Sequence, residues 1–149
     1  MNTLPTAKSG NLLKVILQSV SEDVLTDTVL SSLLKGSPDS RYGQIKRSVR
    51  AGDLIHLRRG LYALAKPYQR KGINLFELAQ KIYGPSYISL ESALAYHGWI
   101  PEAVYTVTSV SAKRSREVKT PLGMFSYAHI PADPFLAGVE RLESAGSIF

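Results

Sequence analysis

The segment from Leu34 to Lys71 constrains the fold more than any other part of this chain, because turn signals separate its apolar repeats. It opens on Lys-Gly-Ser-Pro, in which Gly suits a left-handed helix end, Ser suits an N-cap and Pro38 suits the first residue of a new helix. That helix is predicted to run to about Ala51. The run LIHLRRGLYAL that follows predicts two short strands, with Gly60 supplying the tight turn between them.

Two more helices are predicted before this segment. Apolar residues between Asn11 and Val20 recur with the spacing of one helix face. Thr26 is a suitable N-cap for a second helix, with Asp27 in its first turn. Two short strands are not stable alone, so the hairpin must pack against the helices. Helix, turn, helix and hairpin is the element order of a winged helix-turn-helix, which we predict for residues 1–72.

The remainder, residues 73–149, is predicted to be a small helix-plus-antiparallel-sheet module, so that the whole chain belongs to the α+β class. Asn74 with Glu77 resembles a capping box at the start of its first helix. The predicted elements are two helices, a strand and a hairpin, at residues 74–83, 89–97, 104–110 and 117–130.

The positive charge of the chain is concentrated in the segment Leu34–Lys71. This segment holds ten Lys or Arg residues against Asp39 and Asp53, a net charge of +8, whereas the whole chain of 149 residues carries +6. A basic block on a chain that is otherwise nearly neutral predicts a polyanionic partner.

The composition argues against several other classes of protein. The chain has no Cys, which excludes disulfides, Cys-based zinc sites and thiol nucleophiles. His56, His97 and His129 fall on different predicted elements without a ligand at helical spacing, and no Gly-rich phosphate loop occurs. We therefore expect no catalytic residues, no metal, no cofactor and no enzymatic activity. Without a signal peptide or an apolar run long enough for a bilayer, a cytoplasmic protein with no membrane contact is predicted.

The predicted helix from Pro38 presents the side chains that we expect to contact DNA. On a helical wheel Tyr42, Ile45 and Val49 share the face that should be buried. The opposite face and its flanks are polar, and two arginines in the hairpin turn complete the set. The candidate DNA-binding residues are Ser37, Ser40, Arg41, Gln44, Arg47, Ser48, Arg58 and Arg59.

These side chains match the tasks of a DNA-binding surface. Gln44 can form two hydrogen bonds with adenine, and Arg41 or Arg47 can form two with guanine. Ser37, at the helix N-terminus, is placed for a phosphate, and arginines at the hairpin tip suit a narrow minor groove. The alternative is that the basic helix face is simply solvated.

The second half of the chain offers weaker signals. Its Tyr, Phe and Trp side chains can stack on single-stranded bases, although aromatic side chains on a half-buried sheet more often form the core. The basic run Lys113–Arg116 either extends a phosphate footprint or is an ordinary surface loop.

The chain contains the runs RAGDLIHLRRGLYAL, YISLESALAYHGWIPE, TVTS and TPLGMFSYAHIP. Together they resemble the AbiEi family, antitoxins and transcriptional regulators of bacterial abortive-infection (type IV toxin–antitoxin) systems, with similarity from about Leu13 to Phe149. The resemblance implies a winged helix that binds operator repeats in double-stranded DNA upstream of its own operon and represses that operon. Carried over by position, the operator contacts fall on Ser40, Arg41, Gln44, Arg47, Arg58 and Arg59.

The resemblance also implies a nucleotidyltransferase-like toxin as the partner, with antitoxin activity in the more C-terminal module. Proteins of this family usually continue well beyond the position of Phe149, so an incomplete antitoxin module is expected. The alternative function is a protein-interaction module that antagonises the toxin. In that case the winged helix is a scaffold, and the basic block meets an acidic protein surface.

Overall fold

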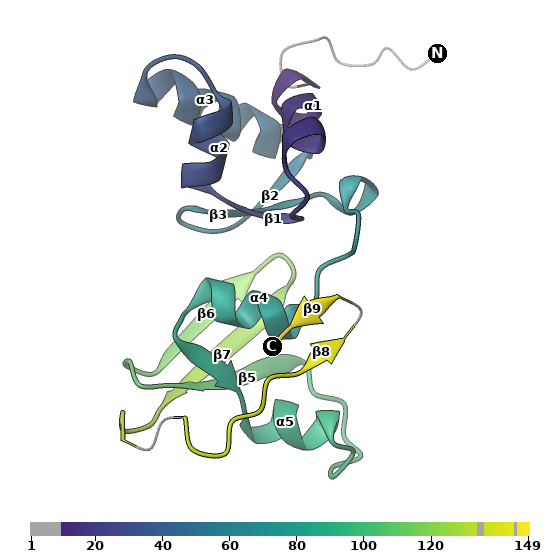
Figure 1. Cartoon of the computed structure of the whole chain (residues 1–149), viewed down its shortest axis with the longest axis vertical. Helices are drawn as coiled ribbons and strands as arrows, with labels where there is room; N and C mark the ends of the chain where they lie inside the picture. The colour runs from purple at the N-terminus through teal and green to yellow at the C-terminus, as the bar shows by residue number, and fades with distance from the viewer. Residues whose placement is uncertain (1–9, 134–135, 145) are drawn as a thin grey trace. The chain divides into compact units, whose positions relative to one another are not determined.

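The structure is a computed structural model that describes residues 10–133, 136–144 and 146–149. The chain forms two compact units, Met1–Gly72 and Ile73–Phe149. Each unit combines helices with a β-sheet (Figure 1). The predicted α+β class is therefore confirmed.

The first unit contains the three predicted helices. Its elements are, in chain order, α1 (Gly10–Ser19), β1 (Val24–Thr26), α2 (Asp27–Leu33), α3 (Pro38–Arg50), β2 (Leu54–Arg58), β3 (Leu61–Leu64) and the short 3-10 helix η1 (Lys66–Tyr68). Side-chain caps explain where two helices begin. The Thr26 hydroxyl accepts a hydrogen bond from the Val29 N–H (3.3 Å), and the Ser37 hydroxyl accepts one from the Ser40 N–H (3.3 Å).

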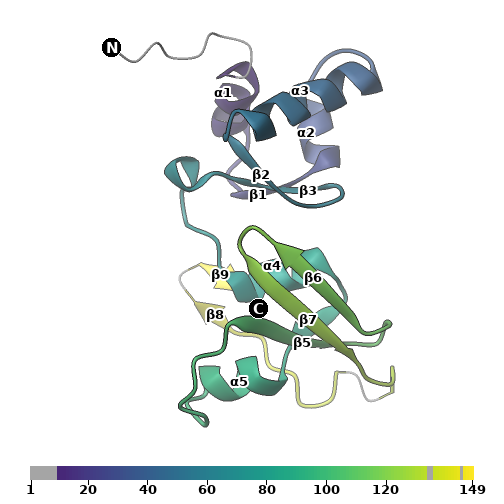
Figure 2. The same ribbon diagram turned by 180° about the vertical axis from the view of Figure 1, so that it is seen from behind.

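The predicted hairpin is also present, but it belongs to a larger sheet. β2 and β3 pair antiparallel, and β1, which the sequence did not predict, pairs antiparallel with the other side of β3. β1 ends at Thr26, the N-cap of α2. This pairing therefore joins the hairpin directly to the helices (Figure 2).

The helices and the sheet of the first unit enclose one apolar core. Its buried members come from every α-helix and strand of the unit: Leu12, Ile16, Leu25, Leu30, Ile45, Leu54, Tyr62 and Leu64. Ile16, Leu30 and Leu64 are completely buried. The hairpin is thus anchored by apolar side chains as well as by hydrogen bonds.

A buried carboxylate fixes the end of the first unit to its beginning. Asp23, which is 7% exposed, accepts hydrogen bonds from the backbone N–H groups of Arg70 (2.9 and 3.1 Å) and Lys71 (2.9 Å). The Arg70 guanidinium donates to the carbonyl oxygens of Leu17 and Val20, at the C-terminal end of α1. The segment after η1 is therefore held against the loop between α1 and β1.

The second unit is built on a four-stranded sheet. Its elements are α4 (Leu75–Ile82), β4 (Ser86–Ile88), α5 (Leu90–Tyr96), β5 (Thr106–Ser111), β6 (Arg116–Thr120), β7 (Gly123–His129), β8 (Glu143–Ser144) and β9 (Ser147–Ile148). The strand order is β4-β5-β7-β6, and β5 runs parallel to β7, whereas the other two pairs are antiparallel. The predicted β6–β7 hairpin is confirmed, but the prediction of an antiparallel sheet is wrong.

The reason for the mixed sheet lies in the burial of β6 and β7. Phe125 and Tyr127 on β7 are 0% and 2% exposed, whereas β6 is largely exposed. The hairpin therefore inserts its apolar second strand beside β5 and leaves its polar first strand at the sheet edge. The chain runs back along β6 after β5 and reverses again at the β6–β7 turn. β7 therefore runs parallel to β5.

Alternate residues of the central strands face different helices. Tyr127 on β7 donates its hydroxyl hydrogen bond to the Ala79 carbonyl on α4 (2.6 Å). Thr108 on β5 contacts α5 instead, since its N–H donates to the Ser92 hydroxyl (2.8 Å) and its own hydroxyl accepts from the Ser92 N–H (2.9 Å). The two helices therefore cover opposite faces of the sheet (Figures 1 and 2).

Glu77 attaches the C-terminal strand β9 to α4. Burial alone would raise the pKa of this carboxyl. Hydrogen bonds with the side chains of Lys81 and Ser147 and with the backbone of Ile148 outweigh that effect and hold the pKa of Glu77 below its ordinary value of 4.5. The contact between Lys81 Nζ and the Glu77 carboxylate is 3.0 Å.

Candidate nucleic-acid interface

The orientation of α3 differs from the one that the sequence predicted. Its fully buried residues are Ile45 (3% exposed) and Ser48 (1% exposed), whereas Tyr42 is 59% exposed. At about 100° per residue, the buried face is turned by roughly 60° from the predicted face. The prediction that Tyr42 is buried is wrong, and Ser48, a candidate DNA contact, lies in the core instead of on the surface.

The amphipathic nature of tyrosine explains this difference. A helical wheel treats Tyr42 as apolar, yet its ring can lie at the surface with its hydroxyl in water. The Lys46 ammonium lies over that ring, 5.9 Å from its centroid. Ser48 carries a short side chain, which a packed interior tolerates more easily than a long polar one.

The exposed face of α3 carries the cationic side chains of Lys46, Arg47 and Arg50. Their spacing of one, three and four residues places them on neighbouring parts of the same side of the helix. Ser40 is exposed in the first turn. Lys46 was not among the predicted contacts, because the helical wheel that placed Tyr42 in the core turned this side of the helix inward.

Gln44 lies at the edge of this face, next to Arg47, whereas Arg41 lies on the side of α3 that carries Ile45 and Ser48. Both side chains are partly buried. Gln44 Nε2 donates to the Lys35 carbonyl at 3.5 Å, a long and weak hydrogen bond that a DNA base can displace. The Nε of Arg41 is buried and has no hydrogen-bond partner among the residues that the structure describes. A buried donor without an acceptor is unfavourable, and a phosphate oxygen can supply the acceptor.

The turn between β2 and β3 presents Arg58 and Arg59, which are both exposed. Arg58 Nη1 donates to the Arg59 carbonyl at 2.7 Å. Gly60 adopts a φ of +75°, which favours glycine, and its carbonyl accepts a hydrogen bond from the Asp27 N–H at 3.0 Å. A Cβ at Gly60 would lie 3.3 Å from the Asp27 carboxylate. The arginine-bearing tip is therefore held at the start of α2.

A hollow of about 600 Å³ lies between α2, α3 and this turn. Arg41 from the helix and Arg59 from the turn both line it, together with Asp27 and Tyr62. Burial, and then the proximity of Tyr42 and Asp27, raise the pKa of Tyr62, so its phenol stays neutral. The two guanidinium groups outnumber the Asp27 carboxylate, and the hollow therefore favours an anion such as a phosphate.

Two side chains of the basic segment have structural roles of their own. The Ser37 hydroxyl is exposed but serves as the N-cap of α3. The guanidinium of Arg70 is bonded to carbonyl groups at the end of α1. Among the predicted contacts, the structure brings Arg41 and Arg59 together at one hollow and buries Ser48 in the core.

The described residues do not assemble a metal site. No group of three or more His, Asp or Glu side chains in that part of the chain could hold a metal ion. None of the helices that the structure describes has the length and apolar character needed to cross a membrane.

Comparison with protein-family models and with curated proteins found no match.

Proposed function

We propose that the first unit, residues 1–72, is a winged helix-turn-helix that binds double-stranded DNA. In this proposal α3 enters the major groove, and the β2–β3 hairpin is the wing that contacts the backbone or the minor groove. Two observations carry the proposal together: α3 has an exposed cationic face, and α2 holds an arginine-bearing turn in place at a hollow that Arg41 of α3 also lines.

In this proposal the side chains of the first unit make two kinds of contact with DNA. Cations contact phosphates, which supply most of the affinity, whereas Gln44 and Arg47 contact bases and supply the specificity. Ser48 is left out of the predicted contact set because it is buried. Lys46 and Arg50 are added to it because they are exposed on the same face as Arg47.

The biological role follows from this binding and from the resemblance to AbiEi proteins. The chain acts as a cytoplasmic transcriptional repressor that binds operator repeats upstream of its own toxin–antitoxin operon. It performs no chemistry of its own. The second unit then belongs to the antitoxin module, and a nucleotidyltransferase-like toxin is its partner.

The test is a titration followed by fluorescence anisotropy, with a labelled duplex of the protein's own upstream region and a scrambled duplex of the same composition. Measurements at several salt concentrations give the number of phosphate contacts. The cations that contribute are Arg41, Lys46, Arg50, Arg58 and Arg59, because Arg47 is assigned to a base. If all of them contact phosphates, log K falls against log salt with a slope of about −5.

Tighter binding to the upstream duplex than to the scrambled one, with a steep salt dependence, is the expected result. Weak and equal binding to both duplexes at low salt would overturn the repressor proposal. The basic surface would then be assigned to an acidic protein partner, and a pull-down with the nucleotidyltransferase-like toxin would test that function.

A further inference from the structure

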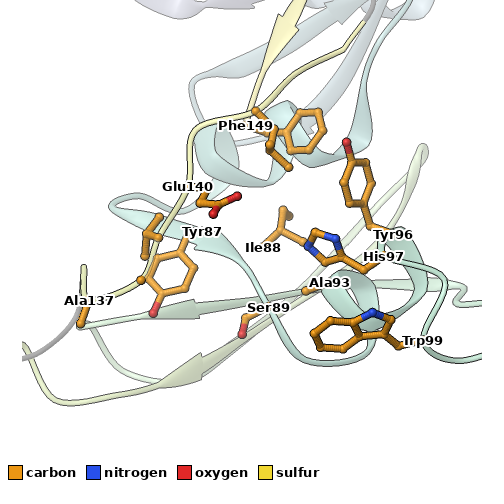
Figure 3. A pocket seen from close by; sticks show the side chains of 13 residues that line it. Tyr87, Ile88, Ser89, Ala93, Tyr96, His97, Trp99, Ala137, Glu140 and Phe149 are labelled. Atoms are coloured by element: carbon orange, nitrogen blue, oxygen red, sulfur yellow. The ribbon is translucent and has the colours of Figure 1, made fainter.

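The second unit contains a hollow of about 550 Å³ between β4, α5 and the segment that precedes β8. Figure 3 shows Tyr96, His97 and Trp99 on one side of it and Tyr87 and Glu140 on the other. A hollow of this size accepts a small molecule or a single side chain. It lies within the second unit, and the inference drawn from it does not depend on DNA binding.

Aromatic rings form one wall of this hollow as a connected row. The ring of Tyr96 lies 5.7 Å from that of Phe149 and 5.3 Å from that of His97, and His97 lies 5.6 Å from Trp99. Trp99 is 74% exposed and Tyr96 is 47% exposed. Trp99 and Tyr96 therefore present ring surface to solvent that the core does not use, a feature typical of binding surfaces.

The charge of the hollow is opposite to that of the chain. Among the described residues that line it, Glu140 is the only one with an acidic side chain, and none is Lys or Arg. The chain as a whole carries +6. Figure 3 shows the Glu140 carboxylate directed into the space between the two walls. Ring faces and a carboxylate both attract positive charge.

We propose that this hollow binds an organic cation, a methylated ammonium or a guanidinium group. The aromatic row supplies cation–π contacts and Glu140 neutralises the charge. A nucleotide fits less well, because Glu140 repels its phosphate and no Lys or Arg of the lining compensates. A neutral base can stack on the rings but gains nothing from the carboxylate.

The experiment uses the fluorescence of Trp99, which is the only tryptophan of the sequence and lines the hollow. The full chain is titrated with choline, with N-acetyl-arginine amide, with 3,3-dimethylbutan-1-ol as the uncharged isostere of choline, and with adenosine. The two cations are expected to change the emission saturably, with a Kd on the order of millimolar. The uncharged isostere and adenosine are expected to leave the emission unchanged.

Two variants test whether the ligand contacts the Glu140 carboxylate and the Trp99 ring. Glu140→Gln keeps the size of the side chain and is expected to weaken cation binding about two- to fivefold. Glu117→Gln is the matched control, because Glu117 is exposed on β6 and does not line the hollow. Trp99→Leu is expected to weaken binding by about the same factor, measured by saturation-transfer NMR on the choline methyl groups. Both Glu140 and Trp99 are exposed, so these variants are expected to fold.

The outcomes separate the ligand classes. An equal response to choline and its uncharged isostere would overturn the proposal, since the hollow would then be merely apolar. Saturation by adenosine with no response to either cation would also overturn it and assign the hollow to a base. If cations bind, a short Gly- and Ser-flanked arginine peptide identifies the source. Tighter binding of the peptide than of N-acetyl-arginine amide indicates a side chain of a partner protein, and equal binding indicates a free cation.

Discussion

Replacing Ser48 with alanine tests whether this residue contacts DNA, as the sequence predicted, or lies in the core, as the structure shows. If Ser48 contacts DNA, Ser48→Ala removes a hydrogen bond to the duplex and weakens binding. If it lies in the core, as its exposure of 1% indicates, the variant leaves DNA binding unchanged and alters only the stability of the first unit.

The size of the stability change follows from two features of the site. The Ser48 hydroxyl is buried and has no hydrogen-bond partner among the described residues, a situation that costs about 1–3 kcal/mol. Alanine also favours a helix interior over serine by about 0.5 kcal/mol. Allowing for the contacts that the oxygen itself makes, we expect the unfolding free energy to rise by about 1–2 kcal/mol.

The assay must report on the first unit, because Trp99 lies in the second. Thermal unfolding followed by far-UV circular dichroism, together with amide hydrogen exchange of α3, meets this need. The midpoint is expected to rise by about 5–10 °C. Ser40→Ala on the exposed side of α3 controls for helix propensity and should give a smaller rise. A Ser48→Ala variant with unchanged stability and weakened DNA binding would refute the reasoning.

Four further predictions concern other parts of the structure. Lys46→Gln should lower the salt slope of DNA binding by about one unit, whereas Lys14→Gln on α1 should not change it. Gln44→Ala should weaken binding to the upstream duplex by about 1–3 kcal/mol and leave scrambled DNA unaffected, and equal losses on both would count against base contact. Asp23→Ala should destabilise the first unit by about 2–4 kcal/mol in chemical denaturation, because two partly buried backbone N–H groups lose a charged acceptor. Folding lowers the pKa of Glu77 below its unfolded value of 4.5. The stability that Glu77 contributes to the second unit is therefore present above pH 4.5 and is lost as the pH falls through the folded pKa. Glu77→Gln should remove this acid-induced loss in the second unit, as acid denaturation will show.

Local signals in the sequence were sufficient for most of the elements. The polar residues Thr26, Ser37 and Asn74 accept hydrogen bonds from the N–H groups of the helices that follow them, as expected for N-caps. Gly60 adopts the positive φ that the hairpin turn requires. These positions were predictable because cap and turn chemistry depends on residues within a few positions of each other.

The features that were not predicted depend on contacts between distant residues. Nothing local indicates that β1 pairs with β3, or that β5 and β7 become neighbours in one sheet. The predicted orientation of α3 was wrong because the orientation depends on which of its side chains pack in the core. Ser48 is buried there, whereas Tyr42 is exposed. The aromatic hollow escaped prediction for the same reason, since Glu140 and Trp99 are far apart in the sequence.

The Asp23 contacts determine where the first unit can be cut from the rest of the chain. A fragment that ends at residue 69 contains every helix and strand of the unit, yet it lacks both backbone donors that satisfy this buried carboxylate. A fragment that ends at Gly72 keeps them, and it also keeps the Arg70 guanidinium on the end of α1. The C-terminal boundary of the first unit is therefore set by two peptide N–H groups beyond its last element of secondary structure.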